Sequence, residues 1–511
     1  MPALRSSLAV ATRLGAALWM AVGSLPALAI ERVELRLPFV DVGFSVKVSE
    51  LSNPQALLSG TSDLADLDRA TNGAIGRQLS QVFQTPLPIS KAAFEQSAES
   101  PLMDQALLVL SSFGALDGLQ TRTLTGPELA AAINRAAAGG QLTILSLLQA
   151  LPGTTARVDL GRVVYLMNRN VRQRQRSEQL LNTLPAAGAD PNLSNPGALA
   201  VQRSQVSLSV AHRPAPLQLV LIQPTARANG RLVVISHGLW DGPESFEGWA
   251  RHLASHGYTV VLPLHPGSDR DQQRAMLSGE APPPSPAELR LRPLDVSAML
   301  DAAQSGRLAQ LAGVKADAVV VIGHSWGAIT ALQLGGGQAS AAQLKRRCPN
   351  VNDADRTLSW VLQCNFTSAV NDAALTDDRV KAVAAVSPPI SLLFDPQAAA
   401  QLQARTLLVA GSRDWVVPPD PEALVPFAAT PPLGHRLVLA KGGDHFNLRA
   451  PAKQTSAPLS PLLLAWVNGA YAAGSQVGPG PAAPSLLPPQ GWGSPEMVLV
   501  DVTPAQAAAV R

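Results

Sequence analysis

Residues 319–330 read VVVIGHSWGAIT, and this stretch decides the fold. Four apolar residues that favour strands lead into Gly323-x-Ser325-x-Gly327, and a segment that favours a helix follows. The positions of Gly323 and Gly327, two residues before and after the serine, must hold small residues for the chain to turn this sharply. The turn lifts the hydroxyl above the carboxyl end of the sheet. Since a bare Gly-x-Ser-x-Gly also arises by chance, the flanking strand and helix are what make Ser325 a candidate nucleophile.

Short runs rich in Val, Leu and Ile recur on both sides of this stretch, and helical segments separate several of them. This alternation predicts a mostly parallel sheet covered by helices, an α/β domain that we place at residues 201–472. The expected strands lie within residues 217–224, 231–238, 258–266, 318–325, 380–389, 406–414 and 435–443. Two insertions interrupt the alternation, a Pro-rich loop at 267–291 and a segment at 338–378 long enough for a lid.

The remaining chain predicts a second, smaller domain, as 511 residues exceed the usual size of one hydrophobic core. Residues 30–183 have a mainly helical pattern, except that residues 33–48 alternate as in a β-hairpin. Pro, Gly and Asn gather at residues 184–200, which we interpret as a linker. The tail at 473–511 is rich in Pro and Gly and predicts a flexible extension.

Residues 1–29 have the features of a secretory signal peptide. Arg5 and Arg13 supply a weak basic region, an apolar stretch follows, and Ala27-Leu28-Ala29 suits cleavage. An uncleaved N-terminal anchor is the alternative. We expect the mature protein to be exported to the periplasm or the cell exterior.

Composition excludes several classes of partner. Hydrophobic residues make up 46% of the chain and charged residues 15%, which indicates a large core. A net charge of +3 gives no field that would favour nucleic acid or a polybasic membrane contact.

Cys348 and Cys364 predict either one disulfide or two buried thiols, and both readings stay open. Nothing in the sequence indicates a metal or a cofactor, and the oligomeric state stays open.

Serine needs a base to take its proton, and the base needs a carboxylate that orients it. When serine stands on a turn of this kind, the acid and then the histidine follow it along the chain. Asp414 follows the strand that begins at 406, and His445 follows the strand that begins at 435. Both therefore lie at the carboxyl end of the sheet with Ser325, and we predict a Ser325, Asp414, His445 triad.

Other residues compete for these roles. Asp444 neighbours the histidine, but we interpret it as structuring its loop, since adjacent residues seldom aim their side chains at each other. Asp420 lies six residues beyond Asp414 and remains the alternative acid. His435 precedes its strand and is expected at the opposite end of the sheet.

An acyl transfer also needs N–H donors aimed at the developing oxyanion. The backbone N–H of Trp326 is one expected donor, because it directly follows the nucleophile. The loop after residues 231–236 should supply the other, and we choose Leu239, with Trp240 as the neighbouring alternative. We expect His237 to brace this loop and His324 to lie beneath the turn.

These residues resemble a known family. VVVIGHSWGA, GSRDWVVPP and GGDHF look like an α/β-hydrolase, and the resemblance implies that fold and the same triad. HPGSD at 265–269 and RPLDVSAML at 292–300 are similar to the dienelactone-hydrolase-like and platelet-activating-factor-acetylhydrolase-like branch. The N-terminal segment resembles an uncharacterised helical domain that precedes such hydrolases in exported, chiefly cyanobacterial proteins. Dienelactone hydrolases proper use cysteine as nucleophile, so serine here favours acyl esters over lactones.

The sequence thus predicts a serine hydrolase that cleaves carboxylic esters, of small molecules or of lipids, through an acyl-enzyme. A short-acyl phospholipid ester is one candidate substrate. The segment 338–378 would cover an apolar acyl pocket with Leu358, Trp360, Val361, Leu362 and Phe366, although these residues equally suit ordinary packing. Two alternatives stay open: an acyltransferase on the same triad, and a non-catalytic protein that binds the envelope. Peripheral contact with a membrane or the envelope also stays open.

Overall fold

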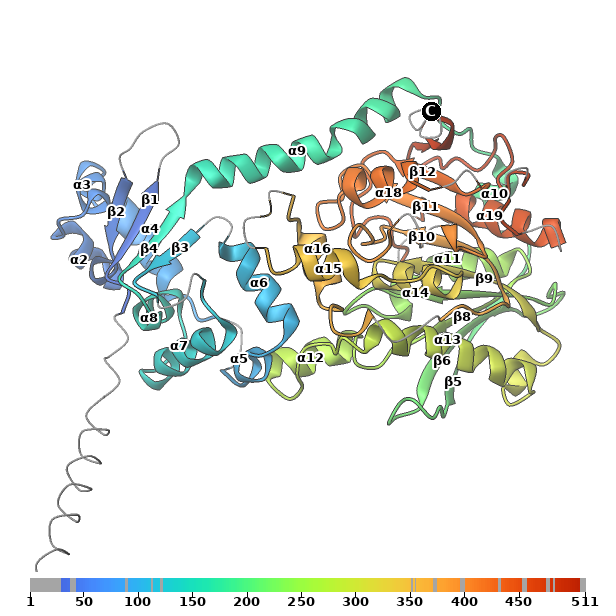
Figure 1. The fold of residues 1–511 in the computed structure, drawn as a ribbon, viewed down its shortest axis with the longest axis horizontal. Coiled ribbons are helices and arrows are strands. Elements are labelled where there is room, and N and C mark those ends of the chain that lie inside the picture. The colour runs from blue at the N-terminus through green and yellow to red at the C-terminus, as the bar shows by residue number, and fades with distance from the viewer. Residues whose placement is uncertain are drawn as a thin grey trace, which may run out of the picture. The chain divides into compact units, whose positions relative to one another are not determined.

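A computed structural model of the chain describes residues 29–505 (Figure 1). The description leaves out residues 37–42, 88–90, 112–113, 120–122, 351–352, 354, 371–374, 396–399, 431–432, 453–456, 475–477 and 481–482. The expected signal peptide therefore lies outside the described residues, apart from Ala29. Within the described part, no helix combines the length and the apolar character needed to cross a membrane.

The chain forms two compact units. One comprises Met1–Lys91 and Phe113–Gly161, and the other comprises Ala92–Ser112 and Arg162–Arg511. This division differs from the boundary expected near residue 183, because a segment of the N-terminal half joins the larger unit. In that segment, α6 (Pro101–Ser111) packs against α16 (Leu358–Cys364).

The smaller unit contains a four-stranded sheet in the order β2-β1-β4-β3. β1 (Arg32–Arg36) and β2 (Gly43–Lys47) pair antiparallel and correspond to the expected hairpin. β4 (Thr155–Asp159) pairs parallel with β1 and antiparallel with β3 (Gly114–Asp117). The expectation of a lone hairpin is therefore corrected, and the two added strands are too short and too polar to be recognised in the sequence.

Helices surround this small sheet. Thr125 and Glu128 form a capping box, with each side chain bonded to the other's backbone N–H. The helices of this unit are η1 (Val48–Ser52), α2 (Pro54–Leu58), α3 (Asp63–Ala70), α4 (Ala74–Gln84), α7 (Gly126–Ala138) and α8 (Ile144–Ala150).

The larger unit contains a nine-stranded sheet in the order β13-β12-β11-β10-β9-β7-β8-β6-β5, whose strands run from green β5 to orange β12 in Figure 1. Neighbours from β8 through β12 pair parallel, and antiparallel pairs occur at the two edges. The strands are β5 (Val201–Leu208), β6 (Leu217–Pro224), β7 (Arg231–Ser236), β8 (Thr259–Pro263), β9 (Lys315–His324), β10 (Val380–Val386), β11 (Arg405–Gly411), β12 (Arg436–Ala440) and β13 (Leu499–Asp501).

All seven strands expected in this sheet are present, and the mostly parallel, helix-covered architecture is confirmed. The alternation of side chains divides the core between the two faces. Val320 and Ile322 contribute to a cluster with α11 (Glu247–Ser255) and α19 (Ser460–Ala473). Val319 and Val321 contribute to a cluster on the other face with α13 (Glu288–Gln304) and α14 (Trp326–Leu334).

The remaining helices of the larger unit precede, connect or follow the strands of its sheet. They are α5 (Lys91–Ser97), which begins at the boundary, α9 (Leu160–Thr183), α10 (Pro191–Ser194), η2 (Pro243–Ser245), α12 (Arg270–Ser278), α13 (Glu288–Gln304), η3 (Ala309–Leu311), α14 (Trp326–Leu334), α15 (Ala341–Arg347), η5 (Asp420–Leu424) and α18 (Val425–Ala428). The Pro-rich region at 267–291 was expected to be a loop, but it contains α12, whose first turn is capped by Asp269.

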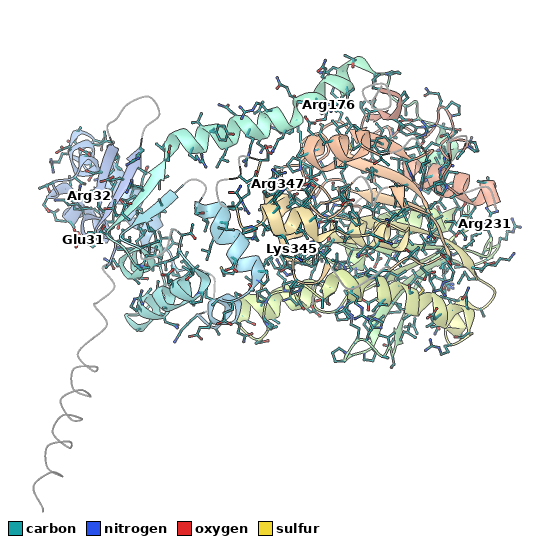
Figure 2. The ribbon with its side chains drawn as sticks, viewed as in Figure 1. Glu31, Arg32, Arg176, Arg231, Lys345 and Arg347 are labelled. Atoms are coloured by element: carbon teal, nitrogen blue, oxygen red, sulfur yellow. A yellow bond between two sulfur atoms is a disulfide. The ribbon has the colours of Figure 1, made fainter. Side chains whose placement is uncertain are left out.

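The insertion at 338–378 contributes to a small hydrophobic cluster that it shares with α13 and α14. A disulfide joins Cys348 to Cys364, which decides between the two readings of the cysteines. Trp360 lies in this cluster, and the guanidinium of Arg347, labelled in Figure 2, lies 4.3 Å from the centre of its ring. The carbonyl of Cys348 accepts hydrogen bonds from Arg356 and from Gln105 of α6.

The C-terminal segment was expected to be a flexible extension, and this expectation is wrong for its described part. β13 pairs antiparallel with β12 and closes one edge of the large sheet. Leu486, Leu487 and Trp492 are buried in the core cluster that contains α11 and α19. Pro and Gly are frequent here because the chain follows the surface of the sheet in turns, and apolar side chains between them anchor it.

Trp492→Ala should lower the stability of the larger unit by about 3 kcal/mol, because it removes a buried aromatic side chain and leaves a cavity. Val498→Ala is the control, since Val498 is 44% exposed, and it should change stability by less than about 0.5 kcal/mol. Urea unfolding followed by circular dichroism measures both. Equal midpoints for the two variants would contradict a packed C-terminal segment.

Candidate active site

Ser325 stands on a tight turn between β9 and α14. Its backbone has φ 55° and ψ −120°, a conformation that residues other than glycine rarely adopt. The turn needs glycine at both flanking positions: a Cβ at Gly323 would lie 2.0 Å from the Gly327 carbonyl oxygen, and a Cβ at Gly327 would lie 2.0 Å from the Ser236 carbonyl oxygen. The Ser325 N–H donates to the carbonyl of Val386 at the end of β10. The predicted nucleophile therefore lies in the strained turn that the sequence indicated.

Asp414 and His445 meet as the sequence predicted. The Nδ1 atom of His445 lies 2.9 Å from Oδ2 of Asp414. The other carboxylate oxygen, Oδ1, accepts the backbone N–H groups of Val416 and Val417 at 3.0 and 2.8 Å. These contacts fix the carboxylate, which is fully buried, and they leave the Nε2 atom of His445 for other partners.

The loop of His445 lies against the turn of Ser325. The Nε2 atom of His324, the residue before Ser325, lies 2.9 Å from the carbonyl oxygen of His445. The rings of the two histidines have their centres 4.7 Å apart. His324 thus lies beneath the turn, as expected, and connects the two loops.

The competing residues are engaged elsewhere. The carboxylate of Asp420 accepts the backbone N–H groups of Arg176 and Ser177 in α9, both at 3.1 Å. Asp444 accepts the N–H groups of Phe446 and Asn447 in its own loop. These contacts give the two alternative acids structural partners.

His435 also has a structural partner. Its Nδ1 atom accepts the backbone N–H of Thr406 at 3.1 Å, at the amino ends of β11 and β12. The expectation that His435 lies at the opposite end of the sheet from Ser325 agrees with this position.

The loop after β7 runs beside the nucleophile. A Cβ placed on Gly238 would lie 3.2 Å from the Cβ of Ser325. Leu239 follows directly, whereas Trp240 donates its N–H to the carbonyl of Ser268 at 2.7 Å. This bond uses the N–H of Trp240, which was the alternative oxyanion donor. Trp326 is the first residue of α14, so its N–H has no acceptor within the helix.

His237 braces this loop. Its Nδ1 atom lies 2.7 Å from the carbonyl oxygen of Gly238, and its Nε2 atom accepts the backbone N–H of His265 at 3.0 Å. Burial, with the positive charge of Arg292 nearby, holds the pKa of His237 well below its ordinary value. The imidazole is therefore neutral at pH 7 and donates through Nδ1.

The insertion at 338–378 contacts Trp326, the residue after the nucleophile. The indole Nε1 of Trp326 donates to the carbonyl of Leu362 at 3.2 Å, and its ring centre lies 4.5 Å from that of Phe366. Trp360 and Val361 are also buried, whereas Leu358 is partly exposed. Among the residues expected to line an acyl pocket, most therefore pack within the protein around Trp326.

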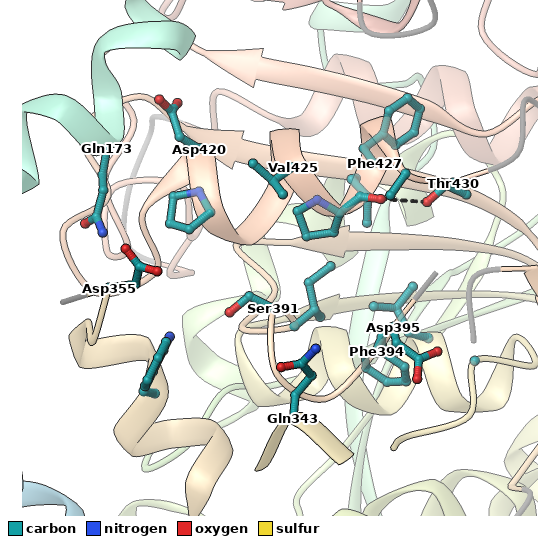
Figure 3. A pocket seen from close by; sticks show the side chains of 18 of the residues that line it. Gln173, Gln343, Asp355, Ser391, Phe394, Asp395, Asp420, Val425, Phe427 and Thr430 are labelled. Carbon is teal, nitrogen blue, oxygen red and sulfur yellow. Dashed lines mark hydrogen bonds between the residues drawn. The ribbon is translucent and has the colours of Figure 1, made fainter. Parts of the chain in front are cut away.

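A cavity of about 690 Å³ lies elsewhere in the larger unit (Figure 3). Gln173 of α9 and Asp420 lie on one side of it, and Phe394 and Asp395 on another. Ser325, Asp414 and His445 are not among its lining residues. This cavity is distinct from the triad.

In the part of the chain that the structure describes, no group of three or more His, Cys, Asp or Glu side chains is arranged to hold a metal ion.

Comparison with protein families agrees with this geometry. Residues 231–336 match the family described as "alpha/beta hydrolase fold", and this segment contains β7, β9 and the turn of Ser325. The chain contains an α/β-hydrolase domain. Residues 29–159 match the family described as "Alpha/beta hydrolase of unknown function". This second match covers most of the smaller unit. No curated protein matches the chain.

Sequence reasoning missed the residues that connect the loops of the site. Asp241 accepts from Arg270 at 2.8 Å and from Arg449 at 2.9 Å, which ties the loop after β7 to the loop of His445. The sequence did contain a signal, because both charged residues lie next to a motif of the site. Asp241 follows the candidate oxyanion loop, and Arg449 follows the histidine by four residues.

Acid should destabilise this protein in the range where histidine titrates. Burial lowers the pKa of His252, His265 and His435 to about 4, and it also holds those of His237 and His324 well below the ordinary value. The unfolded chain binds these protons near pH 6.5, so stability is lost as pH falls from about 6.5 toward 4.

His435→Asn isolates one such group, since the amide oxygen can accept the Thr406 N–H in place of Nδ1. Its unfolding free energy should fall less steeply with acid than that of the wild type, by at most about 1.4 kcal/mol per pH unit. Denaturant titrations at about pH 7, 6 and 5 measure the difference. Identical slopes would show that His435 is not held neutral.

Proposed function

We propose that this protein is a serine hydrolase that cleaves carboxylic esters through an acyl-enzyme intermediate. The observation that carries the proposal is the contact between His445 Nδ1 and an immobilised Asp414 carboxylate, in a loop that packs against the strained turn of Ser325. A strained serine beside an oriented histidine is the arrangement that nucleophilic acyl transfer needs.

In the proposed mechanism, Ser325 Oγ attacks the ester carbonyl while His445 Nε2 takes its proton. Asp414 remains ionised and stabilises the imidazolium. The N–H groups of Trp326 and Leu239 donate to the oxyanion of the tetrahedral intermediate. Collapse of the intermediate breaks the bond to the alcohol, which leaves with the proton from His445. Water then attacks the acyl-enzyme by the same steps and releases the acid.

The substrate is proposed as an ester of a small molecule or a lipid. Leu239 lies against an apolar cluster that includes Trp326, Ile329 and Trp360, and this supports an acyl group with apolar character. Short-acyl phospholipid esters fall within this class.

Export is part of the proposal. Residues 1–29 have the pattern of a signal peptide, and the Cys348–Cys364 disulfide suits an oxidising compartment.

Ser325→Ala should lower turnover of nitrophenyl esters by at least about a thousandfold while leaving the thermal midpoint near that of the wild type. Ser278→Ala is the matched control, because this serine is exposed on α12. The measurement uses the purified mature protein and acyl chains from acetyl to palmitoyl, and the preferred length separates a short-acyl esterase from a lipid-directed one. No turnover at any length, together with no labelling of Ser325 by a fluorophosphonate, favours the non-catalytic alternative.

Asp414→Asn should lower kcat by about 10⁴-fold, because the amide no longer holds His445 in the tautomer with a proton on Nδ1. Asp420→Asn is the control, and it should retain kcat within about threefold, since its partners are backbone N–H groups of α9, away from His445. Steady-state kinetics on one ester compares the two variants. Full activity of Asp414→Asn would transfer the role to another carboxylate. Adding a competing alcohol in the same assay detects acyl transfer.

A further inference from the structure

A second array of serine, histidine and aspartate lies beneath the loop that carries Leu239. Ser236 Oγ lies 2.9 Å from Nε2 of His265, and Nδ1 of His265 lies 2.8 Å from Oδ2 of Asp295. All three side chains are fully buried. They come from the end of β7, from the segment after β8 and from α13.

This array has no access to a substrate, so its role differs from that of Ser325. Ser236 is the last residue of β7 and directly precedes the loop of residues 237–240. Its carbonyl oxygen lies against the Cα of Gly327, where a Cβ would come within 2.0 Å. Ser236 therefore lies between the loop and the turn of the nucleophile.

The loop is held by further bonds from the same two segments. The backbone N–H of His265 donates to Nε2 of His237, and the carbonyl of Ser268 accepts the N–H of Trp240. Arg292, on α13, donates to the carbonyl of His237. His237 and Trp240, which lie on either side of Gly238 and Leu239, are thus each bonded to the 265–269 segment, and His237 is also bonded to α13.

The charges of the array are balanced inside the protein. Asp295 accepts from Arg213 at 2.9 and 2.7 Å and contacts His212 at 2.8 Å. Arg213 also pairs with Glu288, whose Oε2 accepts the hydroxyl of Ser268 at 3.0 Å. An ion pair that satisfies its hydrogen bonds in this way remains stable when buried, whereas removal of one partner leaves a costly charge.

These partners fix the direction of each hydrogen bond. Burial opposes the charge of Asp295, but its bonds to His265 and Arg213 lower its pKa to about 2. At pH 7 the neutral imidazole of His265 donates through Nδ1 to Asp295 and accepts through Nε2. The hydroxyl of Ser236 is then the donor to His265.

We propose that Ser236, His265 and Asp295 are positioning residues that hold the 237–240 loop so that the Leu239 N–H is aimed at the oxyanion. This inference rests on the proposed esterase function. A loop bonded on both sides of Leu239 keeps a donor oriented before the reaction, which is the condition for oxyanion stabilisation.

Ser236→Ala tests the proposal through the ratio of rates on matched oxo- and thionoesters. The sulfur of a thionoester accepts hydrogen bonds poorly, so a misplaced donor slows the oxoester more than the thionoester. We expect the oxo-to-thiono ratio of kcat to fall by about tenfold, with KM within about twofold. The pH midpoint of kcat/KM should equal that of the wild type.

Ser359→Ala is the matched control, because Ser359 is equally buried and donates to Glu422 in a different part of the unit. It should lower the thermal midpoint without changing the ratio. An unchanged ratio in folded Ser236→Ala would overturn the proposal, as would a parallel loss with both esters or a shifted pH midpoint. If Ser236→Ala does not fold, Ser236→Cys retains a weak donor of similar size, and failure of both to fold assigns the array to stability alone and overturns the proposal.

The wild-type enzyme separates this inference from the proposed function. Ester turnover that depends on Ser325, with a ratio unaffected in Ser236→Ala, leaves the function standing and removes only the positioning role. Absence of turnover by the folded wild-type protein overturns both.

Discussion

The close approach of three backbone segments around Ser325 is the constraint on which the rest of the site depends. Gly327 lies against the carbonyl of Ser236, and Gly323 lies against the carbonyl of Gly327, with no room for a side chain at either glycine. This contact sets the separation between the end of β7 and the start of α14. The two proposed oxyanion donors, Leu239 and Trp326, belong to these two segments, so the glycines fix their separation as well.

The large sheet holds this crowded turn in its strained conformation. A serine in the left-handed region is strained by about 1–3 kcal/mol, and such strain persists only where the surroundings determine the backbone. Here the Ser325 N–H is bonded to Val386, and β9 is buried between β7 and β10 with a hydrophobic cluster on each face. The central position of β9 therefore makes the conformation of Ser325 a property of the whole domain.

How far the sequence predicts this protein depends on whether the information is local. Seven of the nine strands of the large sheet were predictable, because strands buried on both faces are continuous apolar runs. The order of Ser325, Asp414 and His445 placed three side chains at one edge. β13 was missed because Pro and Gly around it suggested a flexible tail, while Trp492 is held by tertiary packing. β3 and β4 of the small sheet were missed because they are short and polar, whereas its hairpin was predicted.

The buried charges beneath the 237–240 loop illustrate the same limit and explain why polar residues stand there. Arg213, His265 and Asp295 belong to three separate segments, so no local pattern shows that they meet. Apolar side chains would fill this space at lower desolvation cost, but dispersion contacts have little directional preference, and a loop packed only on them can shift by small distances. Hydrogen bonds between fully partnered groups are directional. A site that must aim one N–H at a developing charge benefits from this directionality, and the benefit offsets the desolvation cost of the buried charges.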